Sequence, residues 1–253
     1  MFDVFTISII VLTFLIAGTV KGVIGLGLPT VSLALLIVFV DLPNAMALLL
    51  VPSLVTNIWQ ATTGGNGKVI LQRLWLFFLM ATITVWLGAI TLTRVDLALL
   101  SALLGVLLVV YATVSLAGYR FTISKTQESW VGPIVGTVNG VLTGMTGSFV
   151  VPAVMYLQSI GLSRDMLVQA MGILFTLSTV ALAIALQGNG LLTIELGKVS
   201  AAAIIPAVVG MIFGQRIRQK LSEQLFRRTF LIALLVLGGY IIVNALTGFI
   251  ARN

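Results

Sequence analysis

The chain has 253 residues, of which 59% are hydrophobic and only 8% charged. Since a soluble domain carries about 25% charged residues, this composition predicts a protein whose surface faces lipid. Cysteine and histidine are both missing from the sequence, which removes thiol nucleophiles, the commonest general base and the commonest metal ligand. We therefore expect no metal site, no cofactor and no enzyme activity. The net charge of +7 lies mostly in short loops, a pattern typical of membrane topology and not of nucleic-acid binding.

Ten apolar segments follow one another along the chain and predict a polytopic all-α membrane protein. They show no period-two alternation, which a membrane β-barrel would require. The segments of the first half are 4–26, 28–40, 44–62, 73–92 and 97–118, and those of the second half are 131–146, 148–160, 164–187, 194–214 and 229–250. A bilayer crossing needs roughly 20 residues, so 28–40 and 148–160 are predicted to be half-spans or short, steeply packed helices.

The basic residues are distributed unevenly between the two sides of the predicted membrane. If each segment reverses the direction of the chain, one side carries eleven of them and the other three. The larger set is Lys21, Lys68, Arg73, Arg120, Lys125, Arg164, Arg216, Arg218, Lys220, Arg227 and Arg228, and the smaller is Arg94, Lys198 and Arg252. Because basic loops stay in the cytoplasm, we expect a bacterial cytoplasmic-membrane protein with both termini outside the cytoplasm.

The two halves of the chain resemble each other at a nearly constant offset. Residues 18–20 (GTV) match 136–138, and residues 65–67 (GNG) match 188–190. Five segments per half is an odd number, so the second copy is expected to enter the membrane from the opposite face. The sequence therefore predicts two inverted repeats, residues 1–118 and 131–253, joined by a cytoplasmic linker over 119–130. In transporters of this plan the substrate site lies between the repeats near the midplane.

Each predicted repeat opens on a glycine-rich motif, which reads GTVKGVIGLGLP at 18–29 and GTVNGVLTGMTG at 136–147. Glycines four residues apart form a face without side chains, and helix packing explains them as well as a binding role does. They are Gly18, Gly22, Gly136, Gly140 and Gly144.

The residues that follow these glycines are helix breakers. We therefore predict a broken or short helix pair opening each repeat. The N–H groups of each short helix, around Thr30–Val31 and Phe149–Val151, are expected to present partial positive charge to an anion.

The motifs GVIGLGLPTVSLALL and TGMTGSFVVPAVMYLQ, together with VPSLVTNIWQ and RDMLVQAMG, resemble the TauE/SafE family of sulfite and organosulfur exporters. The resemblance extends over essentially the whole chain. It implies a membrane transporter for small anions that contain sulfur or carboxylate. The commoner pattern of this family has a denser run of adjacent glycines in each half. This chain departs from that pattern, so the resemblance does not specify the substrate.

Polar residues in and near the motifs are the candidate substrate-binding set. Lys21 either snorkels to the cytoplasmic interface or binds the anion. Asn57 and Gln60 either join helices or donate to the substrate. Thr143, Thr146 and Ser148 either cap the second short helix or line the site. The full set is Lys21, Gly25, Gly27, Thr30, Asn57, Gln60, Asn139, Thr143, Thr146, Gly147, Ser148 and Gln169.

Two charged features outside this set have simpler explanations. Arg164 and Asp165 are predicted to form a local ion pair at the membrane interface. The basic run GQRIRQKLSEQLFRR at 214–228 is predicted to anchor the topology on anionic lipid.

The sequence as a whole favours a secondary transporter that exports a small anion, with the anion and the lipid bilayer as its partners. The alternative is a non-transporting membrane assembly or receptor factor. Such a factor has no need of paired broken helices, and the chain offers it no soluble sensing domain.

Overall fold

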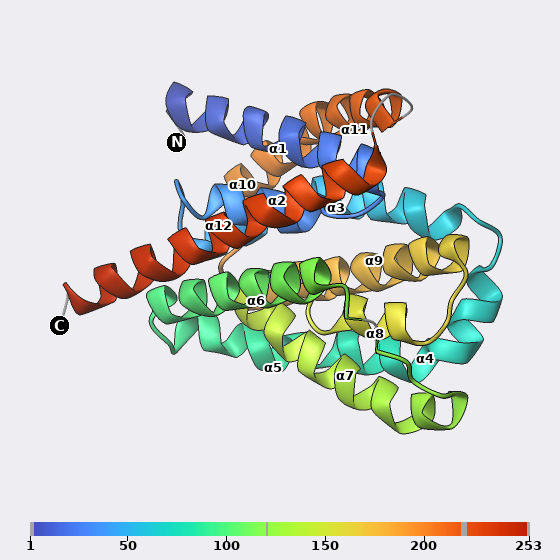
Figure 1. Ribbon diagram of the computed structural model, residues 1–253. Coiled ribbons are helices and arrows are strands. Elements are labelled where there is room, and N and C mark those ends of the chain that lie inside the picture. The colour runs from blue at the N-terminus through green and yellow to red at the C-terminus, as the bar shows by residue number, and fades with distance from the viewer. Residues whose placement is uncertain (1–2, 120, 219–221, 252–253) are drawn as a thin grey trace.

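The computed structural model describes residues 3–119, 121–218 and 222–251, and this part of the chain is helical without strands (Figure 1). The first half contains α1 (Val4–Ile24), α2 (Leu28–Leu36), α3 (Leu42–Thr62), α4 (Gly67–Ile83), α5 (Val85–Ala89), the 3₁₀ helix η1 (Ile90–Thr93) and α6 (Leu97–Ala117). The second half contains α7 (Lys125–Thr146), α8 (Ala153–Ser159), α9 (Arg164–Gly188), α10 (Ile194–Ala202), α11 (Ile204–Arg218) and α12 (Glu223–Ile250). The all-α prediction is confirmed. Arg120, Lys220 and Arg252, which contribute to the predicted topology, lie outside the described residues.

Seven helical stretches of the described chain are long and apolar enough to cross a membrane. The helices at the two short predicted segments are shorter still, since α2 has nine residues and α8 has seven. Helix α7 begins at Lys125, within the region predicted as a linker, because Ser124 and Gln127 form a capping box at its start. Residues 125–130 therefore extend this helix.

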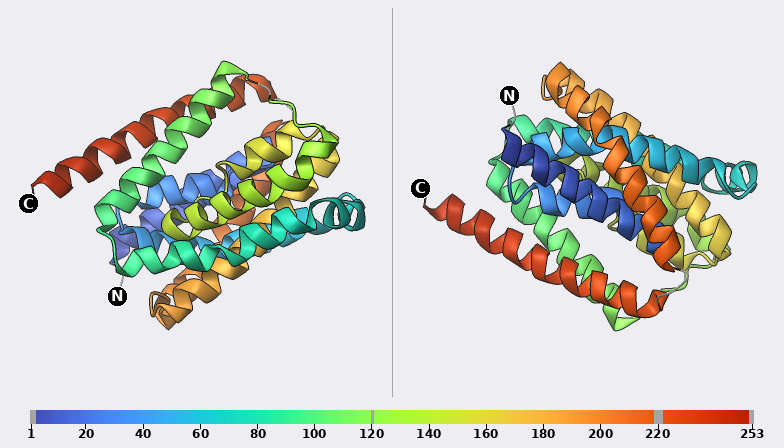
Figure 2. Two further views of the ribbon diagram at one scale, coloured as in Figure 1. Left: turned by 90° about the horizontal axis from the view of Figure 1, so that it is seen from below. Right: turned by 90° about the horizontal axis from the view of Figure 1, so that it is seen from above.

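The helices pack in three layers with a fourth group on one flank. Helices α3 and α9 pack against each other in the interior. The pair α1 and α11 lies on one side of them, and α4, α5 and α7 lie on the other (Figure 1). Helices α6 and α12 run side by side along the flank, as Figure 2 shows.

The regularly spaced glycines lie where two helices approach backbone to backbone. A Cβ atom on Gly18 would lie 2.1 Å from the carbonyl oxygen of Ala207, and one on Gly22 would lie 2.2 Å from that of Met211. Four residues along α1, from Gly18 to Gly22, the contact moves four residues along α11, from Ala207 to Met211. The two helices therefore run parallel. In the second half Gly136, Gly140 and Gly144 make the corresponding contacts with α4 and α5. The packing explanation of these glycines is confirmed.

A helix break follows each motif, as predicted, but the two breaks differ in length. Helix α1 ends at Gly25, whose φ of 84° suits glycine, and α2 begins three residues later at Leu28. Helix α7 ends at Gly147, whereas α8 begins only at Ala153. The predicted helical N–H groups at Phe149–Val151 are therefore wrong, because the residue before a proline avoids the helical region and Pro152 delays the helix.

Candidate functional site

Lys21 lies in the last turn of α1 and points toward α3. Its side chain is only 5% exposed. The ammonium nitrogen Nζ donates to Thr56 Oγ1 at 3.1 Å and also to Asn57 Oδ1. The snorkelling alternative is therefore wrong, because the side chain is held inside the helix bundle. Both partners are neutral, so they leave the ammonium charge uncompensated.

A cleft of about 360 Å³ opens beside Lys21 between the ends of α1, α3, α9 and α11. We call it the basic cleft, because Lys21, Arg164 and Arg218 line it with Asp165 as the one acid among the described lining residues. Its volume falls in the range of small-molecule pockets. Its other lining residues are Ile24, Gly25, Thr56, Trp59, Gln60, Thr63, Gly64, Val168, Met211 and Gln215.

A buried polar stripe on α3 leads from the basic cleft into the bundle. Its members are Ser53, Thr56, Asn57 and Gln60, which share one helix face because they stand at i, i+3, i+4 and i+7. All four are buried. The stripe covers about 10 Å at the rise of an α-helix.

Two atoms of this stripe, Ser53 Oγ and Asn57 Nδ2, are buried and have no hydrogen-bond partner among the described residues, and the same holds for Ser178 Oγ on the facing helix α9. Leaving such groups unpaired in a membrane interior is costly. The stripe therefore has unused donors and acceptors for a polar ligand or water.

Two glutamines fix the position of α3 against α9 next to the basic cleft. Gln60 Nε2 donates to the carbonyl oxygen of Val168 at 2.7 Å, and Gln169 Nε2 donates to that of Ala61 at 2.8 Å. Gln169 also accepts from the backbone N–H of Asn66 at 2.9 Å. For Gln169 the interhelical role accounts for the whole side chain, whereas Gln60 additionally lines the cleft.

The polar residues of the second motif satisfy one another. Asn139 Oδ1 accepts from the backbone N–H of Ala153 at 3.3 Å. Thr143 Oγ1 donates to the carbonyl oxygen of Ser148 at 2.9 Å, and the Ser148 N–H donates to Thr146 Oγ1 at 3.2 Å. The expectation that serine or threonine caps the short helix is wrong, because the longer amide of Asn139 reaches its first N–H group.

The structure brings together only part of the predicted site. Lys21, Gly25 and Gln60 line the basic cleft, and Asn57 joins them through Lys21. The others that line no part of this cleft are Gly27, Thr30, Asn139, Thr143, Thr146, Gly147, Ser148 and Gln169.

Most of these remaining residues either form the hydrogen-bonded group around Asn139 in the second half or are buried where helices pack. Gly147 abuts side chains of α2 and α3, while Gly27 and Thr30 are packed at the start of α2. The cleft lies near the C-terminal ends of α1 and α3, whereas the sequence placed the site near the midplane.

Some residues of the cleft and of the α3 stripe were missed by sequence reasoning. Thr56 and Ser53 carry a detectable signal, namely their helical spacing with Asn57 and Gln60 in VPSLVTNIWQ. Arg164 was assigned to an ion pair at the membrane interface, and Arg218 to a topological anchor. Nothing in the local sequence places these two arginines beside Lys21, because three separate helices bring them there.

Comparison with known proteins gives one result. No curated protein and no solved structure matches the chain. The model of the sulfite exporter TauE/SafE family, a family of membrane transporters, matches residues 10–241. Seven apolar helices of membrane-spanning length agree with this match. The chain therefore belongs to the sulfite exporter TauE/SafE family and is an integral membrane protein.

Proposed function

We propose that this protein exports a small sulfur-containing anion, such as sulfite or a sulfonate, and that the basic cleft receives it. The observation that carries the proposal is the buried ammonium group of Lys21, whose hydrogen-bond partners are neutral. Ionisable residues inside membrane helices are costly and usually functional. An anion in the cleft would compensate this charge.

The donors around Lys21 suit an oxyanion. An ammonium group has three N–H donors, of which Thr56 and Asn57 take two. The third remains for a ligand oxygen. The charges of Arg164 and Arg218 on the cleft wall raise the local concentration of anions.

The α3 stripe offers a route beyond the cleft. Ser53 and Asn57 supply polar atoms that have no partner within the described chain. An anion that leaves Lys21 would meet these groups next. These unpaired polar atoms of α3 support a path for the anion along this helix, between the two halves of the chain.

Two inverted repeats are the architecture that we infer for this path. The parallel contact of α1 with α11 and that of α7 with α4 and α5 support it, since each joins the first helix of one half to the fourth segment of the other. The basic ends of α11 and α12 support a cytoplasmic position of the cleft. We infer a bacterial cytoplasmic membrane with both termini outside the cytoplasm.

Transport into sealed inside-out vesicles tests the proposal. Labelled sulfite is expected to enter vesicles that contain the protein faster than vesicles without it. An excess of unlabelled sulfonate should slow this uptake, while an organic cation of similar size should not. Uptake equal to that of empty vesicles for sulfite, sulfonates and carboxylates alike would contradict the proposal and favour a non-transporting membrane factor.

A further inference from the structure

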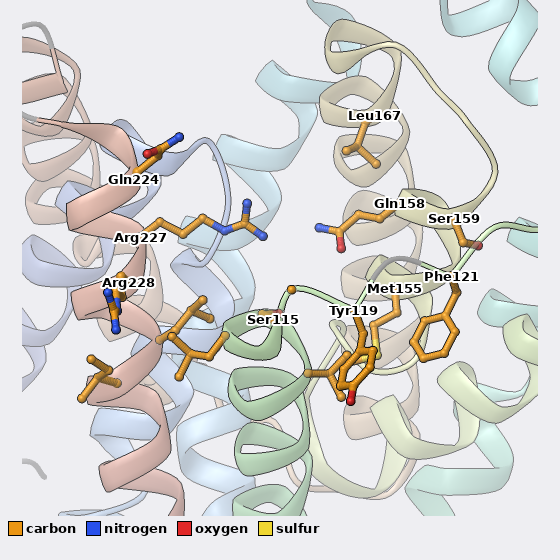
Figure 3. A pocket seen from close by; sticks show the side chains of 15 residues that line it. Ser115, Tyr119, Phe121, Met155, Gln158, Ser159, Leu167, Gln224, Arg227 and Arg228 are labelled. Carbon is orange, nitrogen blue, oxygen red and sulfur yellow. The ribbon is translucent and has the colours of Figure 1, made fainter.

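A cavity of about 920 Å³ lies apart from the basic cleft. It separates the ends of α6 and α12 from α8 and α9 (Figure 3). We call it the α6–α12 cavity. Its lining residues are Val114, Ser115, Leu116, Gly118, Tyr119, Phe121, Met155, Gln158, Ser159, Leu167, Gln224, Arg227, Arg228, Leu231 and Ile232.

One wall of this cavity is positively charged and rich in hydrogen-bond donors. Arg227 extends from α12 across the cavity toward Gln158 of α8 (Figure 3). Arg228 and Gln224 belong to the same turns of α12. The described lining residues include two arginines and neither aspartate nor glutamate, so the charge of this wall calls for an anionic occupant.

The remaining walls are apolar. Val114 and Leu116 of α6, Met155 of α8, and Leu231 and Ile232 of α12 supply hydrocarbon surface within the same cavity. A small inorganic anion would leave this surface unused. An anionic head joined to hydrocarbon chains would use both the basic wall and the apolar one.

An exposed tyrosine places the mouth of the cavity at the level of lipid headgroups. Tyr119 and Phe121 line it, and their side chains are 73% and 60% exposed. Tyrosine side chains in membrane proteins concentrate at the level of the headgroups, because their rings are amphipathic, and Tyr119 therefore places the mouth there. The topology that we infer puts this mouth in the cytoplasmic leaflet.

Helix α9 separates this cavity from the basic cleft. Leu167 faces the α6–α12 cavity, whereas Arg164 and Val168 face the cleft. The two spaces thus lie on different sides of one helix, at the same end of it. An occupant of one space therefore need not pass through the other.

We propose that the α6–α12 cavity binds an anionic phospholipid of the cytoplasmic leaflet. The phosphate lies against Arg227 and Arg228, and the first part of the acyl chains lies along the apolar wall. The bound lipid fills the space between the α6–α12 pair and the rest of the bundle. The cavity is thus a lipid site separate from the transport path.

Native mass spectrometry of the purified full-length protein tests this site with two lipids of identical chains. Phosphatidylglycerol is anionic and phosphatidylcholine is zwitterionic. Attraction to an anionic surface amounts to about fivefold in affinity for each arginine. The wild type is therefore expected to prefer phosphatidylglycerol by about twenty-five-fold if both arginines contribute. The double variant Arg227→Gln, Arg228→Gln is expected to lose this preference.

Control variants separate a specific site from general attraction to basic protein surface. Arg216→Gln removes an exposed charge from α11, outside the cavity lining, and should keep the preference. Met155→Trp fills the apolar wall without changing charge and should weaken phosphatidylglycerol binding. If that variant fails to fold, Ile232→Gln replaces it as the test of the apolar wall.

Competition experiments identify the source of the phosphate. Glycerol 3-phosphate and sulfite lack acyl chains and should fail to displace phosphatidylglycerol from the wild type. Displacement by glycerol 3-phosphate would overturn the proposal in favour of a soluble phosphate ester, and displacement by sulfite would assign the cavity to transport. An undiminished lipid preference in the double arginine variant would overturn it directly.

Discussion

Lys21 on α1 donates a hydrogen bond to the side-chain oxygen of Asn57 on α3, inside the helix bundle. The position that matches Lys21 in the second motif is Asn139, which accepts from the backbone N–H of Ala153. The two halves thus use equivalent positions for different purposes. One holds a charge beside the basic cleft, and the other fixes the start of a short helix.

Replacing Lys21 by glutamine is expected to lower anion transport strongly without unfolding the protein. A hydrogen bond to a charged group is worth about 1.5–3 kcal/mol, so affinity should fall by about ten- to a hundredfold. Replacing a buried charge with a neutral side chain often leaves stability unchanged or raises it. Uptake into inside-out vesicles, normalised to inserted protein, measures the effect.

The matched control for this variant is Lys68→Gln, which removes an exposed lysine from the first turn of α4. It should transport at the wild-type rate. Lys21→Arg keeps the charge but presents a planar fork and should keep partial activity. Wild-type transport by Lys21→Gln would remove Lys21 from the site.

Replacing Asn57 by aspartate is expected to abolish transport while preserving the fold. The carboxylate has nearly the shape of the amide and would pair with the Lys21 ammonium, so the cleft would lose its uncompensated charge. The negative charge of the aspartate also repels an incoming anion. Thermal unfolding should show equal or higher stability, and vesicle uptake should show the loss.

Asn44→Asp is the control for this charge change, because it lies at the opposite end of the same helix. There a negative charge agrees with the helix dipole. Transport should be unchanged. If Asn57→Asp transports sulfite normally, the pairing of Lys21 with a neutral amide has no role in anion binding.

The sequence predicted the helical class and the helix breaks, and it offered helix packing as one of two explanations of the glycines, because these features depend on local composition and spacing. Gly25 and Gly147 end their helices where the motifs place them. The start of α8 was misplaced because Pro152 acts against helix formation just before it. Local chemistry thus set most element boundaries.

The candidate site was only partly predictable, for a physical reason. Lys21 was recognised because a charge in an apolar segment stands out, but its direction depends on the packing of α1 against α3. Arg164 and Arg218 reach the cleft from α9 and α11, and sequence spacing carries no information about such distant approaches. Asn139, in turn, was assigned to the substrate although its side chain caps a helix.

Gly22→Ala is expected to destabilise the contact between α1 and α11. The added methyl group would lie 2.2 Å from the Met211 carbonyl oxygen, so the helices must separate. Overpacking of this kind typically costs about 1–3 kcal/mol. The midpoint of thermal unfolding in detergent should fall. Gly239→Ala, where a Cβ meets nothing within 4 Å, should leave the midpoint unchanged or raise it, and an equal fall in both variants would contradict the packing role.

Single-cysteine labelling is expected to place Lys125 in the cytoplasm and Arg94 outside. The chain has no native cysteine, and both positions are exposed, so each label reports one site. In intact cells an impermeant maleimide should label Arg94→Cys and spare Lys125→Cys. Permeabilised cells should show labelling of both. The reverse pattern in intact cells would invert the topology.

Transport is expected to follow the membrane potential and to need no proton gradient. The seven acidic residues of the chain lie at helix starts. Asp3, Asp41 and Asp96 are N-caps, Glu128, Asp165 and Glu195 lie in first turns, and Glu223 is the first residue of α12. Carboxylates at these positions are stabilised by the helix dipole. With no histidine in the sequence, the helix interiors of the described chain lack the carboxylates and imidazoles from which proton relays are built.

An anion that leaves a negative-inside cell gains about 2.3 kcal/mol per charge for each 100 mV. Inside-out vesicles with a potassium gradient and valinomycin impose this potential without a pH difference. Sulfite uptake should rise when the vesicle interior is made positive and fall when it is made negative. Uptake that ignores the potential but follows an imposed pH gradient would show that protons drive transport. Asp165 would then be the first residue to replace, because it is the one carboxylate among the described residues that line the basic cleft.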